Sequence, residues 1–231
     1  MTSRLRQSVL FVCFISIVGA VRPATAQTVT DERFWFNLTL QDRGGTASPW
    51  HWSMEFILRS RDVVEALDSS AIRPTITYNL TPRSSVGGGY LIGRTDPAAG
   101  RTTIEHRFFG QYAWRTPAAG GTLTLRTRFE ERVIVDDTGP IARLRQQARF
   151  SHAVTPGSKL SWVVYDELFV HLNSTNRYRS GIDHNRAYAG LSGALSPALR
   201  VDLGYLNQFI PGHNIPDRMN HILSGTFVVG F

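Results

Sequence analysis

The sequence is poor in cysteine, lysine and long apolar runs. Cys13 is its single cysteine, so the chain cannot form an internal disulfide. No stretch of about 20 apolar residues lies outside the N-terminal region, which excludes a bundle of membrane-spanning helices. Disorder is also excluded, because the chain carries 5 Trp, 7 Tyr and 13 Phe and only 19% charged residues. A chain of 231 residues suits one domain or two small ones, with a sizeable core or a closed barrel.

The N-terminal segment has the pattern of a secretory signal peptide over residues 1–26. Arg4 and Arg6 precede an apolar segment at Val9–Val21, and small residues at 24 and 26 form a cleavage site. A membrane anchor would need a longer apolar stretch. Cleavage after Ala26 leaves residues 27–231 as the mature domain, without cysteine. An exported chain of this kind must be held by core burial or by closure of a sheet.

The mature chain has a modest positive charge that is carried by arginine. Without Arg4, Arg6 and Arg22, 22 basic residues face 18 acidic ones, which gives a net charge of +4. Lys159 is the only lysine. Two explanations for arginine in place of lysine are open: an arginine-biased genome, or the better fit of guanidinium groups to confined carboxylate networks. The signs are interspersed and no basic run occurs, so nucleic acid is not an expected partner.

Alternation of apolar and polar residues predicts an all-β protein. Phe34–Gln41 alternates in this way, and Gly121–Val133 places leucine and phenylalanine on one face and arginine and glutamate on the other. Such a period of two is typical of strands with one apolar face. No comparably long stretch has a period of 3.6; Arg61–Leu67 could form one short helical turn in a loop.

Ser/Thr-Pro pairs divide the mature chain into repeated hairpins. The pairs begin at Ser48, Thr81, Thr116, Thr155 and Ser196, and each interval holds two strand-like segments around a more variable polar loop. The five loops are Arg59–Ser70, Thr95–Arg101, Asp136–Pro140, Ser174–His184 and Pro211–Arg218. Up-and-down barrels of the outer membrane of Gram-negative bacteria have this asymmetry, with short periplasmic turns and longer extracellular loops.

The last strand-like segment ends in an aromatic residue and predicts an assembly signal. Phe227, Val229 and Phe231 share one face. This pattern resembles the C-terminal signature by which the barrel-assembly machinery recognises outer-membrane barrels. With the signal peptide and the loop pattern, it predicts an outer-membrane location, with membrane lipid and the assembly machinery as partners. A soluble exported barrel or sandwich is the alternative, but it has no need for an aromatic-rich outer face.

The strand count is 10 to 12. Five hairpins give ten strands, and Phe34–Gln41 adds an eleventh. The residues before it, Gln27–Arg33, are few for a tilted crossing strand. Because bacterial single-chain barrels usually have an even number of strands, either the N-terminal segment enters through the lumen or a short twelfth strand closes the barrel. The predicted fold is an up-and-down antiparallel transmembrane β-barrel.

Several segments resemble one bacterial family. They are Phe34-Trp35-Phe36-Asn37, Ile104-Glu105-His106-Arg107, Arg126–Arg132, Tyr165–Val170, Asp183–Arg186, Leu195-Ser196-Pro197 and Gly204–Gln208. On these segments the chain is similar to domain of unknown function 2490 (DUF2490), whose members are predicted outer-membrane barrels. The resemblance covers most of the mature chain. It implies a fold and a location, and it implies no activity.

The inner face of the predicted barrel carries the residues with chemical content. They are Glu105, Arg107, Arg126, Arg128, Glu130, Arg132, Arg143, Arg145, Arg149, Asp166, Glu167 and Arg186. A charge facing lipid near the bilayer midplane would cost about 2–4 kcal/mol, which favours the inward orientation. Asp166 and Glu167 are alternatives, because a bulge decides which of them faces inward. The set predicts either a plug of arginine–carboxylate pairs, or a narrow anion-preferring, porin-like pore or ligand site for a small anionic solute.

A lipid-modifying hydrolase of the outer membrane is the alternative function. Its candidate residues are His106, His171 and Asn173, with Ser151, Ser161 and Ser192 as possible nucleophiles. No Gly-x-Ser-x-Gly motif is present. No catalytic residue is therefore assigned, and whether the chain is an enzyme stays open.

Other motifs are weak. Gly87–Gly89 has no following Walker lysine and predicts a thin strand that allows close approach. The pairs His184 with Asp183 and His213 with Asp217 fall short of a metal site. We therefore expect no metal and no cofactor.

Overall fold

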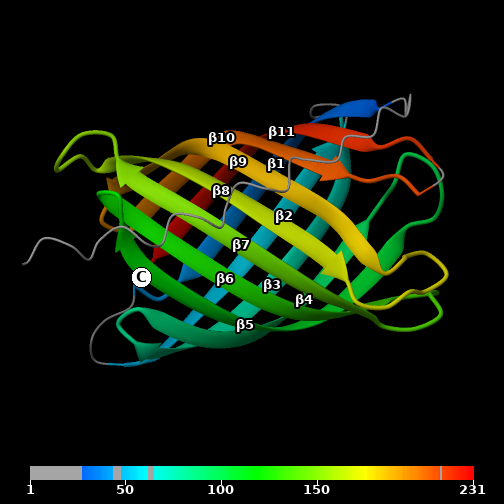
Figure 1. The fold of residues 1–231 in the computed structure, drawn as a ribbon, viewed down its shortest axis with the longest axis horizontal. Helices are drawn as coiled ribbons and strands as arrows, with labels where there is room; N and C mark the ends of the chain where they lie inside the picture. Colours follow the sequence, from blue (N-terminus) through cyan, green and yellow to red (C-terminus); the bar gives the residue numbers. More distant parts are fainter. Residues whose placement is uncertain (1–27, 44–47, 62–64, 214) are drawn as a thin grey trace, which may run out of the picture.

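The computed structural model describes residues 28–43, 48–61, 65–213 and 215–231, so the predicted signal peptide lies outside the described residues. These residues form a closed barrel (Figure 1). Its strands are β1 (Val29–Gln41), β2 (Trp50–Arg61), β3 (Ala66–Thr81), β4 (Ser84–Thr95), β5 (Thr103–Ala118), β6 (Gly121–Ile134), β7 (Ile141–Ala153), β8 (Leu160–His171), β9 (Gly181–Ser196), β10 (Leu199–Ile210) and β11 (Arg218–Gly230). The predicted all-β barrel of 10 to 12 strands is confirmed. No helix among these residues is long and apolar enough to cross a membrane.

A parallel pair closes the barrel. Each strand pairs antiparallel with its neighbour in the chain, but β1 pairs parallel with β11, from Val29 opposite Arg218 to Gln41 opposite Gly230. The cause is parity: in an up-and-down ring of eleven strands, the first and last strands run in the same direction. The two alternatives given for the residues before Phe34 are therefore wrong, because Val29–Arg33 lengthen β1 and the eleven strands close the ring without a twelfth.

The two ends of the barrel have different connections. Two-residue turns join β3 to β4, β5 to β6 and β9 to β10, and we call this the tight-turn end. In the β5–β6 turn, Ala119 and Gly120 have φ angles of 46° and 76°, as a type I′ turn requires. The same end also carries longer connections of eight residues between β1 and β2 and six between β7 and β8, whereas the five connections at the opposite, long-loop end have four to nine residues.

Three predicted strand or loop boundaries differ from those in the structure. Thr116-Pro117 lies within β5 rather than in the turn, because Ala119 and Gly120 supply the turn geometry. The predicted loop at Arg59–Ser70 is mostly paired, since β2 and β3 continue to Arg61 opposite Ala66. The predicted loop Ser174–His184 ends earlier, because β9 begins at Gly181.

The outside of the barrel is more apolar than its inside. Among the described residues, thirty large apolar side chains are exposed, whereas only twelve apolar side chains are buried, beside thirteen buried polar or charged ones. Four of the five tryptophans, Trp50, Trp52, Trp114 and Trp162, are exposed near the tight-turn end. Phe231 is exposed at the same end, 5.4 Å from Trp52 between ring centroids.

The predicted assembly residues lie along this outer wall. Phe227 contacts Phe36 of β1 at 5.5 Å between ring centroids, and Val229 lies opposite Leu40. The Phe231 amide donates to the Gln41 carbonyl. The end of β11 is therefore joined to β1, the strand that closes the barrel.

Glycines admit large rings to the interior. Gly89 faces Phe109, and a Cβ at position 89 would collide with the Phe109 ring and the Pro74 carbonyl. Gly190 and Gly204 oppose each other on β9 and β10 and leave room for the Tyr188 hydroxyl. The predicted thin strand at Gly87–Gly89 therefore serves close packing. The apolar part of the interior is a cluster of Trp35, Val163, Tyr188, Leu206 and Ile222.

Candidate functional site

A fully buried carboxylate, Glu130 of β6, lies at the centre of the charged interior. Arg143 donates to its Oε2 at 2.9 and 2.5 Å, and Arg145 donates to its Oε1 at 2.6 Å. Arg107 and Arg128 lie at 3.7 and 3.8 Å from the same oxygen, Oε1. The alternation of β6 turns Glu130 inward, since Phe129 on the opposite face is exposed. A charge buried in this way is tolerated only with such partners.

Two further glutamates extend this network. Glu105 of β5 accepts from Arg107 at 2.7 Å and from Arg132 at 2.8 and 3.0 Å. Glu167 of β8 accepts from Arg145 at 2.8 Å and from Arg126 at 2.8 Å. Because Arg107 and Arg145 also lie against Glu130, one continuous chain of ion pairs crosses β5, β6, β7 and β8. We call this chain the β5–β8 network.

Smaller clusters lie toward the two ends. Near the long-loop end, Asp183 accepts from Arg143 at 2.9 Å and lies 3.0 Å from His184 Nδ1 and 3.3 Å from His171 Nε2. Near the tight-turn end, Arg149 lies 3.6 Å from Asp202. The described residues contain no group of three or more His, Cys, Asp or Glu arranged to hold a metal ion.

Aromatic rings support several of the arginines. The guanidinium carbons of Arg145 and Arg186 lie 4.3 and 4.5 Å from the centroid of Phe169. Arg128 lies 4.2 Å from the Phe109 centroid. Stacking of this kind occupies the face of a guanidinium and leaves its N–H groups free to donate in the plane.

Two of the arginines that line the barrel interior lack an acidic partner among the described residues. Arg59 of β2 and Arg186 of β9 have no hydrogen bond or ion pair there, and the Nε atom of each is buried and unsatisfied. Both stack on Trp35, with guanidinium carbons 4.3 and 4.8 Å from its ring centroid. Arg186 lies opposite Glu167 in register, but Glu167 Oε1 already accepts from Arg126 and Arg145.

A cavity of about 580 Å³ occupies the part of the lumen that the β5–β8 network leaves open. Gln41 and Arg200 line it near the tight-turn end, and Thr95 and Tyr178 line it near the long-loop end. Its lining includes eleven arginines but only five acidic residues, so the space is strongly positive.

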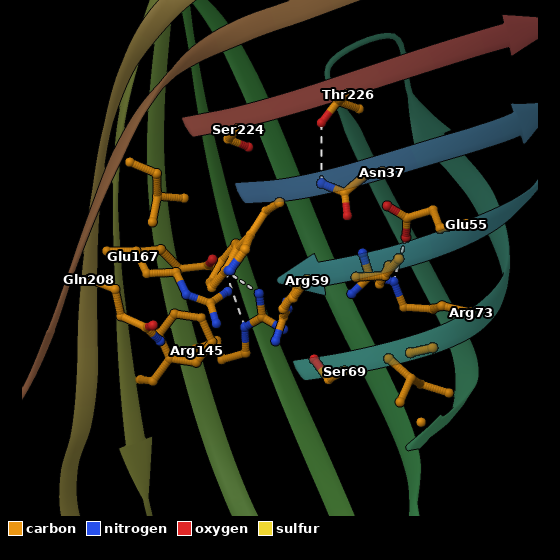
Figure 2. A pocket seen from close by; sticks show the side chains of 18 of the residues that line it. Asn37, Glu55, Arg59, Ser69, Arg73, Arg145, Glu167, Gln208, Ser224 and Thr226 are labelled. Atoms are coloured by element: carbon orange, nitrogen blue, oxygen red, sulfur yellow. Dashed lines mark hydrogen bonds and ion pairs between the residues drawn. The ribbon is translucent and has the colours of Figure 1, made fainter. Parts of the chain in front are cut away.

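The wall between β9 and β2 is different in character. Asn37 of β1 donates to Thr226 of β11 at 3.3 Å, and Ser224 and Gln208 lie nearby on the same wall. Figure 2 shows Arg59 and Arg145 projecting into the space from other strands, while Asn37 and Thr226 bond on this wall. A second cavity, of about 420 Å³, shares Arg126, Arg149 and Arg200 with the first and lies toward the tight-turn end.

Eleven of the twelve residues predicted for the lumen line the cavity or are buried inside the barrel. The prediction is wrong for Asp166, which lies on the outer wall, where both of its carboxylate oxygens accept from Asn185 Nδ2 at 3.0 Å. Glu167 is the acid that faces inward. The bulge in the β8–β9 pairing falls between Phe169 and Val170, beyond both acids, so simple alternation decides between them.

Sequence reasoning missed Arg59, Arg73 and Glu55. Arg73 donates to Glu55 across β2 and β3. The sequence does carry a signal for Arg73. Arg73 shares a strand face with Thr75, whereas the apolar Ile72 and Ile76 lie on the other, outer face, so alternation predicts that Arg73 faces inward. Arg59 was not predicted to face the lumen because Arg59–Ser70 was predicted to be a loop.

The hydrolase candidates do not come together. His106 faces outward and its Nδ1 lies 2.5 Å from the Tyr90 hydroxyl, while His171 lies inside near Asp183. Ser161 and Ser192 face each other near the tight-turn end, and Ser192 donates to Asp202. Within the described ranges, no serine hydroxyl bonds to a histidine ring. The geometry therefore gives no support to a serine hydrolase.

Comparison with known proteins identifies the family. Residues 32–220 match the family described as "Protein of unknown function (DUF2490)". An uncharacterized protein of Methylorubrum extorquens is 28% identical over 223 residues, which cover 95% of this chain and 96% of that protein. No solved structure matches the chain. The chain belongs to the DUF2490 family.

Proposed function

We propose that this protein is an outer-membrane barrel, exported through a cleaved signal peptide, whose arginine-lined lumen admits small anions. The observation that carries the proposal is the positive cavity, whose lining residues come from both ends of the barrel. In this proposal the long-loop end faces the outside of the cell and the tight-turn end faces the periplasm.

The apolar outer wall supports the membrane part of the proposal. Apolar surface left in water costs roughly 25 cal/mol per Å², and thirty large exposed apolar side chains would make the barrel poorly soluble. In a bilayer the same surface is favourable. The ring of tryptophans near the tight-turn end has the position of an interfacial aromatic girdle.

The charges of the lumen support the anion preference. Fields in a confined space with low-dielectric walls are stronger than fields on an open surface. The β5–β8 network lines one side of the cavity, and its glutamates neutralise part of the charge there, but the lining as a whole keeps an excess of arginine. A narrow, slowly conducting anion path follows from this excess.

Planar-bilayer recording on the refolded chain tests the lumen. We expect small single-channel currents, with a reversal potential under a salt gradient that indicates anion preference. A cation preference would refute the proposal. Inserted protein without any current would instead indicate that arginine–carboxylate pairs close the lumen.

A pair of outward substitutions tests the membrane part. Ile72 lies near the middle of β3 and is 42% exposed, whereas Leu195 lies next to the last residue of β9 and is 71% exposed. We expect Ile72→Lys to lower the free energy of unfolding in lipid by about 2–4 kcal/mol and Leu195→Lys to lower it by about 0–1 kcal/mol. If water surrounds the wall, both changes are neutral and the membrane proposal fails.

A further inference from the structure

Arg59 and Arg186 both line the cavity and stack on the same ring, Trp35, and neither has a carboxylate within ion-pair distance among the described residues. In the ring they belong to β2 and β9, with β1, β11 and β10 between them. Because both stack on Trp35, their guanidinium carbons are separated by no more than the sum of the two stacking distances. The planar faces are covered by rings and the N–H edges are left unpaired.

The surrounding wall supplies hydroxyl and amide groups. The nearest acid is Glu167, opposite Arg186, and its Oε1 already accepts from Arg126 and Arg145. Ser224, Asn37 and Thr226 line the cavity from β11 and β1. Gln208 of β10 accepts from Asn220 at 3.0 Å and also faces the cavity. Neutral donors next to two guanidiniums suit a ligand that carries oxygen atoms as well as negative charge.

Charge and size define the ligand class. Arg59 and Arg186 are half-buried, their Nε atoms are buried without a partner, and neither has a carboxylate within ion-pair distance, so a doubly charged anion would compensate both. Guanidinium forks match phosphate oxygens with paired hydrogen bonds. A cavity of about 580 Å³ lies within the range of small-molecule sites, so an organic body can accompany the anionic group.

We propose that Arg59, Arg186 and the ring of Trp35 form a specific binding site for a doubly charged oxyanion of the phosphate-monoester class. This inference rests on the proposed function, since it names the solute that the lumen would select. The site lies beside the β5–β8 network and uses none of its ion pairs.

The binding test uses inorganic phosphate as the probe and the full refolded chain in detergent. Equilibrium dialysis at pH 8, where phosphate is mainly doubly charged, should show one phosphate bound per barrel. Arg59→Gln and Arg186→Gln should each weaken binding at least tenfold. Each arginine loses only its stacking on Trp35 or Phe169 and no hydrogen bond or ion pair, so both variants should fold with unchanged heat-dependent gel migration. No binding above that of these variants overturns the inference.

Control variants separate a built site from a general positive field. Arg94 lines the cavity near the long-loop end but is exposed and paired with Asp96, so Arg94→Gln should change phosphate affinity less than twofold. Arg59→Lys keeps the charge and loses the planar fork, so it should still weaken binding several-fold. Equal losses for Arg94→Gln and Arg59→Gln, or full affinity in Arg59→Lys, would show only a diffuse field. Nitrate, a singly charged oxyanion, should not displace phosphate at equal concentration, and displacement would refute the doubly charged class.

Conductance distinguishes this inference from the proposed function. Phosphate binding without any current in bilayers would retain the site and refute the pore. Anion-preferring current without phosphate binding would retain the pore and refute the site. In a protein with both, phosphate should reduce the chloride current of the natural chain, and Arg186→Gln should abolish that reduction.

Discussion

Replacement of Glu130 by glutamine should be one of the most damaging single changes to this barrel. Glu130 is fully buried and accepts the closest hydrogen bonds of the β5–β8 network, from Arg143 and Arg145. The change keeps the shape and removes the charge. Two arginines that are only 4% and 5% exposed then lose a charged acceptor.

The size of the expected loss in unfolding free energy depends on which acceptors Arg143 and Arg145 keep. Arg143 retains Asp183 at 2.9 Å, and Arg145 retains Glu167 at 2.8 Å, so neither is fully stripped. Hydrogen bonds to charged groups contribute about 1.5–3 kcal/mol each, and breaking a buried pair costs about 3–5 kcal/mol. The glutamine oxygen can still accept one of the bonds. We therefore expect Glu130→Gln to lower the free energy of unfolding by about 3 kcal/mol.

Urea unfolding in lipid vesicles, followed by the gel shift between folded and unfolded barrel, measures this loss. Asp202→Asn is the matched control, because Asp202 lies 3.6 Å from Arg149 and is partly exposed, and it should cost under about 1 kcal/mol. A double variant of Glu130→Gln with Arg145→Gln should recover part of the loss, since it removes one uncompensated charge. A loss for Glu130→Gln no larger than that for Asp202→Asn would show that the network does not stabilise the barrel.

Four further outcomes are expected. The protein should fractionate with outer membranes and migrate differently before and after boiling; recovery in the soluble periplasm would contradict the membrane proposal. Deleting Phe231 should reduce assembled barrel in cells, because it removes the aromatic end of β11 beside Trp52, and unchanged levels would argue against the assembly signal. Arg128→Ala combined with Arg145→Ala should lower anion preference in reversal-potential measurements; lower thermal stability with no current in either form would indicate a plug. Gly89→Ala should lower the free energy of unfolding by about 1–3 kcal/mol, because its methyl group would meet the Phe109 ring and the Pro74 carbonyl, whereas Gly110→Ala, with open space around it, should change stability by less than about 0.5 kcal/mol.

Much of the barrel could be predicted because a strand has a period of two. That period assigns each side chain to one face as soon as one apolar face is recognised. Leu123 and Phe129 therefore fixed the orientation of Arg126, Arg128 and Glu130 without any tertiary information. The spacing of the Ser/Thr-Pro pairs likewise predicted the order of hairpins, because four of the five pairs, all except Thr116-Pro117, lie at or beside a connection at the tight-turn end.

The same reasoning failed where the outcome depends on the whole ring. The parity of the strands decides whether β1 and β11 meet parallel or antiparallel, and no local pattern reports parity. Asp166 and Glu167 are adjacent acids, and the sequence could not locate a bulge that would exchange their faces. The pairing of β8 with β9 places the bulge beyond both acids, so Glu167 faces inward and Asp166 bonds Asn185. The length of β2 beyond Leu58 was missed because pairing with β3, rather than its own composition, holds Arg59 in a strand.

The sequence by itself therefore determined the all-β fold, the order of the hairpins, and an interior rich in arginine and glutamate. These properties depend on residue type and on spacing along the chain, which local physics interprets directly. Only the tertiary structure decided which arginine meets which carboxylate, because strands such as β2 and β9 approach each other across the lumen through closure of the ring. That closure leaves Glu130 with four guanidiniums and leaves Arg59 and Arg186 without a carboxylate within ion-pair distance among the described residues.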